Sequence, residues 1–151
     1  MAQATKVEHK ILFLIAIVFF VLFYPMLISI YVFLPLFIGA MSYVLILGLD
    51  KEKSFSLPLA IIYLINLEVN LSLPLFLTII SAFIFYVTLY PSLKYFRRCK
   101  ICKPFLSVII LDFFYLGALF TFDFIFQTQS IVLDNILLYS LVVDMLIVVL
   151  L

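Results

Sequence analysis

The sequence predicts an all-α fold, a polytopic helical membrane bundle of about six transmembrane helices. Composition is the first observation, because 68% of the 151 residues are hydrophobic and only 11% are charged. Soluble domains have about 45–50% apolar and about 25% charged residues, so a water-soluble fold could not cover this much apolar surface. The second and third observations are long uncharged runs and the confinement of basic residues to three segments. We expect residues 1–151 to form one integral membrane domain.

The composition also narrows the class of function. It excludes a soluble enzyme, a nucleic-acid-binding protein, a disordered tail and a disulfide scaffold. The sequence has no Walker loop, no His-Glu-x-x-His and no Gly-x-Ser-x-Gly, and its single histidine, His9, lies in the N-terminal tail. We therefore expect no enzymatic activity, no cofactor, no metal site and no nucleic-acid partner.

The first two predicted spans come from the uncharged run Ile11–Leu49, which follows the polar start MAQATKVEHK. The run exceeds the apolar region of a signal peptide, about 7–15 residues, and no Ala-x-Ala site closes it, so we expect an uncleaved span. As one helix it would be about twice the length needed to cross a membrane. Pro25 and Pro35 bracket the predicted turn. The predicted spans are residues 11–28 and 32–49.

Polar breaks set the four remaining spans. The breaks are the charged loop DKEKS (50–54), the polar stretch NLEVN (66–70), the basic stretch KYFRRCKICK (94–103) and the polar link 123–135. The predicted spans are residues 55–68, 73–91, 104–122 and 135–151. The triplet Leu-Pro-Leu occurs three times near predicted span starts, at 34–36, 57–59 and 73–75, and Pro104 stands in a similar place. We interpret these prolines as helix starts, where proline is favoured.

The placement of lysine and arginine predicts the orientation. With the N-terminus inside, all nine basic residues fall on the cytoplasmic side: two in segment 1–10, two in loop 50–54 and five in stretch 94–103. The positive-inside rule is then satisfied with six spans and both termini cytoplasmic. The basic stretch is explained by this rule alone, and binding of anionic lipid head groups is the other interpretation. The lipid head-group candidates are Arg97, Arg98, Lys100 and Lys103.

Three acidic residues lie in or beside the predicted spans: Glu68, Asp112 and Asp144. No Lys, Arg or His lies within any predicted span, and a buried carboxylate without a partner favours the protonated form. Intramembrane ionisable residues are candidates for function. Three interpretations stay open: a proton or cation site, a salt bridge to another membrane subunit, or a protonated acid hydrogen-bonded to a neighbouring Tyr, Ser or Asn.

Cys99 and Cys102 form a Cys-x-x-Cys motif among basic residues. Basic neighbours favour thiol reactivity or metal binding. Structural zinc takes four ligands, however, and the chain has only these two cysteines and one distant histidine. The predicted topology places the pair in the reducing cytosol, so we interpret it as two ordinary reduced thiols, with a metal or redox role as the alternative.

The layout resembles that of the rod shape-determining MreD family. The resemblance covers most of the chain and lies in the six spans, the proline-bearing turn before the second span and the short charged inner loop. Its most specific part is segment 67–74 (LEVNLSLP), in which Glu68 matches the acidic position that family members tend to show there. Leu73-Pro74 replaces the Leu-Gly of the family, and the usual glycines of the third span are missing.

The resemblance implies a non-catalytic scaffold of the cell-wall elongation machinery in the bacterial inner membrane. The implied partner is the single-span MreC protein, together with wall-synthesis enzymes. The family fold looks like that of the substrate-binding subunits of vitamin transporters, which gives the alternative: a small transporter or substrate-capture subunit that uses the intramembrane carboxylates. The chain has only three glycines, and this scarcity of small residues favours a static bundle over a rocking transporter.

The charge distribution generates a prediction of topology. Reporter fusions after Ser54 and after Lys103 should read cytoplasmic, and a fusion near Gln129 should read external, because the positive-inside rule places the basic segments inside. The measurement is the activity of a reporter that works on one side of the membrane only. A cytoplasmic reading at Gln129 would contradict the six-span topology.

Overall fold

The computed structural model describes residues 2–31, 33–51, 55–93, 101–128 and 135–150. These residues form seven α-helices and no strand, so the predicted all-α fold class is confirmed. The helices are α1 (Ala2–Ile30), α2 (Ile38–Asp50), α3 (Ser56–Asn70), α4 (Leu77–Thr88), α5 (Tyr90–Leu93), α6 (Cys102–Phe126) and α7 (Asn135–Leu150).

Two helices are long and apolar enough to cross a membrane. They are α1, over the 23 residues Glu8–Ile30, and α6, with 25 residues. The helices α2, α3, α4 and α7 are apolar but have only 12 to 16 residues, whereas a full helical span needs about 20. The structure is therefore consistent with a membrane protein, and six full-length helical spans are not confirmed.

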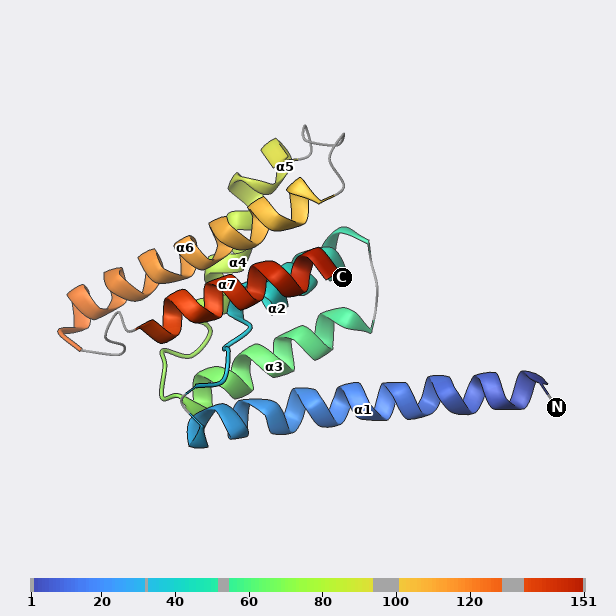
Figure 1. The fold of residues 1–151 in the computed structure, drawn as a ribbon. Helices are drawn as coiled ribbons and strands as arrows, with labels where there is room; N and C mark the ends of the chain where they lie inside the picture. Colours follow the sequence, from blue (N-terminus) through green and yellow to red (C-terminus); the bar gives the residue numbers. More distant parts are fainter. Residues whose placement is uncertain (1, 32, 52–54, 94–100, 129–134, 151) are drawn as a thin grey trace.

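Helix α2 lies at the centre of the bundle, in contact with α3, α4, α6 and α7 (Figure 1). Among the helices described, α1 contacts α3 alone and lies along one edge, with its N-terminal part reaching beyond the other helices (Figure 1). The core is apolar and aromatic, with Ile46, Tyr63, Leu64 and Phe85 fully buried. Every described helix except α1 and the short α5 therefore packs against α2.

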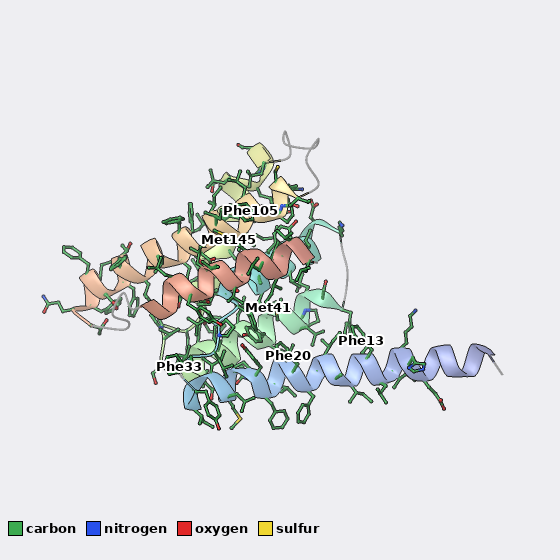
Figure 2. The ribbon with its side chains drawn as sticks, in the orientation of Figure 1. Phe13, Phe20, Phe33, Met41, Phe105 and Met145 are labelled. Atoms are coloured by element: carbon green, nitrogen blue, oxygen red, sulfur yellow. The ribbon has the colours of Figure 1, made fainter. Side chains whose placement is uncertain are left out.

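The outer surface is rich in large apolar side chains. Phe13 on α1 and Phe33 before α2 (labelled in Figure 2) are 68% and 88% exposed. By contrast, the acidic side chains of Glu68 and Asp144 are 0% and 1% exposed. A soluble protein avoids large exposed apolar patches and keeps acidic residues in water. This reversed distribution suits a chain that is surrounded by lipid.

The first turn lies further along the chain than the sequence predicts. Helix α1 continues through Pro25 to Ile30, and Tyr31 and residues 33–37, which precede α2, are not helical. The sequence predicts that Pro25 and Pro35 bracket the turn, but Pro25 lies inside α1, which ends two residues beyond the predicted end of the first span at residue 28. Proline is tolerated inside membrane helices because neighbouring groups can satisfy the freed backbone carbonyl. The second span, predicted from residue 32, is helical only from Ile38.

The irregular segments before α2 and α4 end in the same way. Phe37 and Phe76 adopt the left-handed conformation, with φ angles of 52° and 66°, which costs a non-glycine residue about 1–2 kcal/mol. Pro35 and Pro74 each lie three residues before the first residue of the next helix, α2 or α4. The expectation that these two prolines begin helices is therefore wrong. Pro58 and Pro104 do lie in the first turns of α3 and α6.

The left-handed backbone at Phe76 generates a prediction of stability. Phe76→Val should lower the unfolding free energy by about 1–2 kcal/mol, because a β-branched side chain tolerates a positive φ poorly. Phe76→Gly should relieve the backbone strain, because glycine adopts this conformation freely, so its only cost comes from the half of the ring that is buried. The control is Leu75→Val, at a neighbouring exposed position without a positive φ. Thermal unfolding in detergent measures the effect, and equal stability of the two valine variants would contradict it.

Candidate functional site

The candidate site lies where α2 begins, inside the bundle. Asp144 on α7 accepts a hydrogen bond from the backbone N–H of Gly39, with 2.9 Å between the nitrogen and Oδ2. Asp112 on α6 packs against the same glycine, since a Cβ atom added to Gly39 would lie 2.5 Å from Asp112 Oδ1. The fold thus brings together two of the acidic residues predicted from the sequence, at a position that only glycine fits without displacing Asp112.

Both carboxylates are buried and incompletely hydrogen-bonded. Asp112 is 8% exposed and Asp144 is 1% exposed. Within the described residues, Asp112 Oδ2 and Asp144 Oδ1 have no hydrogen-bond partner. The N-terminus of α2 carries a partial positive charge, which favours an anion beside it. This charge amounts to about half a unit, so one helix end cannot balance two ionised carboxylates.

Side chains from three other helices hold the irregular segment before α2. The N–H of Leu36 donates to Ser140 Oγ, and Tyr63 donates its hydroxyl hydrogen to the Leu36 carbonyl, each over 3.0 Å. Tyr24 donates to the carbonyl of Pro35 over 3.0 Å. Irregular backbone at membrane depth is tolerated only where its polar groups are satisfied within the protein. These hydrogen bonds satisfy the backbone carbonyls of Pro35 and Leu36 and the N–H of Leu36. Pro35 has no N–H that would need a partner.

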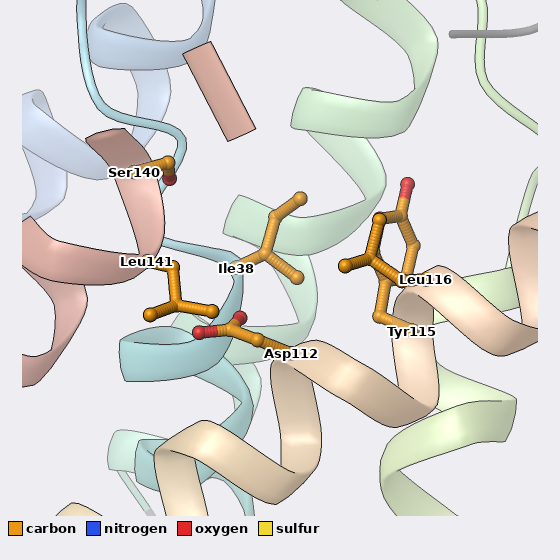
Figure 3. Close-up of a pocket in the computed structure, with 6 residues that line it drawn as sticks. All are labelled: Ile38, Asp112, Tyr115, Leu116, Ser140 and Leu141. Atoms are coloured by element: carbon orange, nitrogen blue, oxygen red, sulfur yellow. The ribbon is translucent and has the colours of Figure 1, made fainter. Parts of the chain in front are cut away.

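A small cavity lies beside Asp112 (Figure 3). It has a volume of about 20 Å³, room for about one water molecule. The Asp112 carboxylate points toward Leu141 and the start of α2 in this view. The residues that line the cavity are Ile38, Asp112, Tyr115, Leu116, Ser140 and Leu141 (Figure 3). The site can therefore hold a proton or a water molecule, but not an organic substrate.

Glu68, the third predicted acid, lies apart from this site and holds the start of α4. Its Oε1 accepts hydrogen bonds from the Thr78 N–H and hydroxyl, at 2.7 and 2.6 Å, and its Oε2 accepts one from the Phe76 N–H at 2.6 Å. A carboxylate at a helix N-terminus satisfies backbone N–H groups that have no partner within the helix. Glu68 is therefore a capping residue that fastens α3 to α4.

The two acid-capped helices share a sequence signature that the span prediction did not use. The tetrapeptide Leu-Pro-Leu-Phe occurs at 34–37 and at 73–76. In both places the second residue after the phenylalanine, Gly39 or Thr78, donates its N–H to a buried carboxylate. Sequence reasoning missed Gly39, Ser140, Tyr24 and Tyr63, and this repeated tetrapeptide is the signal that could have pointed to Gly39.

Of the four residues predicted to bind lipid head groups, the structure describes only Lys103. Its Nζ donates to the hydroxyl of Tyr90 over 3.2 Å and lies 4.6 Å from the centre of the ring. Tyr90 in turn donates to Asp50 Oδ2 over 3.1 Å. Lys103 therefore joins the ends of α2, α5 and α6. The other three candidates, Arg97, Arg98 and Lys100, lie outside the described residues.

Of the two cysteines in the Cys-x-x-Cys motif, the structure describes only Cys102. Cys102 is disulfide-bonded, so the expectation of a reduced thiol there is wrong. A disulfide sulfur is no longer the thiolate that binds metal. Cys99 lies outside the described residues. In the part of the chain that the structure describes, no three His, Cys, Asp or Glu side chains form a group that could hold a metal ion.

Comparison with known proteins adds nothing to this geometry. No protein-family model matches the chain, and no curated protein or solved structure matches it significantly.

The contact between Gly39 and Asp112 generates a prediction. Gly39→Ala should lower the unfolding free energy by about 1–3 kcal/mol, because the new Cβ overlaps a packed carboxylate. Gly117→Ala is the matched control, because a Cβ there meets nothing within 4 Å and alanine is the better helix former. The measurement is thermal or denaturant unfolding in detergent.

A double-mutant cycle tests whether Asp112 is the cause of this effect. In an Asp112→Ala background the cost of Gly39→Ala should largely disappear, since the overlapping atoms are gone. Strictly additive effects of the two substitutions would contradict the contact.

Proposed function

We propose that the chain is a non-catalytic integral membrane scaffold that binds other membrane proteins. The resemblance to the MreD family supports a role in bacterial cell-wall elongation at the inner membrane, with an MreC-like single-span protein as the partner. The exposed apolar surface supports an environment of lipid and apolar helices.

The observation that carries the proposal is a groove between α4 and α6 on the outside of the bundle. It has a volume of about 430 Å³ and is lined by Ile80, Ser81, Ile84, Phe113, Phe114, Gly117, Ala118 and Thr121. The two hydroxyl groups are engaged within their own helices, because Ser81 donates to the Thr78 carbonyl and Thr121 to the Gly117 carbonyl. The groove therefore offers an apolar surface without free hydrogen-bond donors.

The shape of the groove suits one transmembrane helix of a partner. Gly117 and Ala118 lie side by side on α6, and no side chain occupies the space that a Cβ on Gly117 would take. Small residues let the backbones of two membrane helices approach closely. The exposed side chains of Ile80, Ile84 and Phe113 flank this hollow. A partner helix would gain van der Waals contact with both α4 and α6.

The buried acids support a different use from partner pairing. Glu68 and Asp144 contact the backbone of this chain and are almost inaccessible from outside. A basic residue of another subunit would have to open the bundle to reach them. In this proposal, partners therefore bind through the apolar groove, while the acids act within the core.

The alternative of a substrate-capture subunit has less support. Pockets for small organic ligands have volumes of about 300–1,000 Å³ and a few placed polar groups. The acid-lined cavity, about 20 Å³, is too small. The groove is large enough, but its lining has no charged side chain to fix a ligand.

The groove generates a prediction of partner binding. Gly117→Leu should fold normally, since there is open space at this position, but should fill the groove and reduce recovery of the membrane partner at least about tenfold, which corresponds to about 1.4 kcal/mol. Gly117→Ala leaves most of the groove open and is the matched control. The measurement is quantitative co-purification after crosslinking in native membranes.

Two results would count against this assignment. Unchanged partner recovery with Gly117→Leu would exclude the groove as the docking surface. Recovery of lipid alone, with no stoichiometric protein in either the wild type or Gly117→Ala, would exclude the scaffold.

A further inference from the structure

We propose that Asp112 and Asp144 form a proton-binding site at the start of α2, in which Asp112 carries one proton and Asp144 is ionised. The proposal is independent of the scaffold function, since it concerns the interior of the bundle and not the groove. It rests on three observations: the convergence of both acids on Gly39, their buried unpartnered oxygens and the adjacent water-sized cavity.

Two ionised carboxylates at this place would lack sufficient counter-charge. Like charges disfavour each other strongly in a low-dielectric interior. The N-terminus of α2 offsets about half a unit of negative charge. The runs 11–49 and 104–151, which supply α2, α7 and nearly all of α6, contain no Lys, Arg or His. One bound proton removes the excess that the helix end cannot balance.

The side chains that face the site from the surrounding helices do not supply a cation. Tyr24 on α1 and Tyr63 on α3 donate to the backbone before α2, and Ser140 on α7 accepts from it. Tyr115 on α6 lines the cavity. Helix α4, which also packs against α2, has no charged residue. Every group is neutral or acidic, so the compensating positive charge has to come from a ligand.

The hydrogen-bond pattern assigns the proton to Asp112. Asp144 Oδ2 accepts the Gly39 N–H, and this acceptor role suits the ionised form. Asp112 Oδ2 and Asp144 Oδ1 both lack a donor. Ionised carboxylates can only accept hydrogen bonds, whereas a protonated one also donates. A proton on Asp112 therefore supplies the donor that the acid pair lacks.

A metal ion fits this site less well than a proton. Ca²⁺ takes about six to eight oxygen ligands, and Mg²⁺ keeps several waters in its octahedral shell. The cavity beside Asp112 has room for about one water molecule. Ser140 already accepts a backbone hydrogen bond, and a helix N-terminus repels cations. A proton needs neither space nor additional ligands.

Infrared spectroscopy of the purified full chain in lipid vesicles at neutral pH tests the proposal. The wild type should show the carbonyl stretch of a protonated carboxylic acid, and Asp112→Asn should lose it. The amide has nearly the shape of the protonated acid, so the fold should persist. Glu8→Gln, at an exposed position on α1, is the control and should leave the band unchanged.

A second variant keeps the test decisive if Asp112→Asn does not fold. Asp144→Asn removes the negative charge that the proton on Asp112 compensates, so the band should shift or vanish. A wild-type spectrum without the band would overturn the proposal, as would a band that stays unchanged in every folded variant at position 112 or 144. A band that appears only when Na⁺ and K⁺ are removed would identify a cation site in place of the proton site and would also overturn it.

Discussion

The start of α2 inside the bundle is the constraint on which the other features depend. A helix that begins in a core has backbone N–H groups that have no partner within the helix and that lie away from bulk water. Side chains from α1, α3, α6 and α7 surround this point: Tyr24, Tyr63, Asp112, Ser140 and Asp144. In lipid the hydrophobic effect does not drive helices together. Polar contacts to one segment therefore fix the relative positions of several helices.

The start of α4 meets the same constraint with a different arrangement. There the acid, Glu68, comes from the preceding helix and receives three hydrogen bonds, so its bonding capacity is largely used. At α2 the acid comes from the distant α7, and a second acid, Asp112, is present beyond what capping requires. A cap needs one carboxylate, and the surplus acid is what turns a structural feature into a site for a proton.

Helix α6 links the interior site to the outer surface. Asp112 faces the start of α2, whereas Gly117, five positions later, is exposed and lies in the groove beside α4. Five residues at about 3.6 per turn place the two on nearly opposite sides of the helix. One helix thus carries an acidic inner face and an apolar outer face with a hollow, and the two proposed roles use different faces.

The sequence by itself determined the helical class, the approximate places where the long helices are interrupted, and which three acids to examine. Prolines, charged loops and rare intramembrane charges are local signals, so they can be read from neighbouring residues alone. Only the tertiary structure decided that Pro25 continues a helix, that α2 begins at Ile38, and that Asp112 and Asp144 meet at Gly39 while Glu68 caps α4. Apolar residues are spread around the whole circumference of α6 and α7, so no hydrophobic periodicity marks their inner faces. Which residues face each other is therefore set by packing between segments about a hundred residues apart.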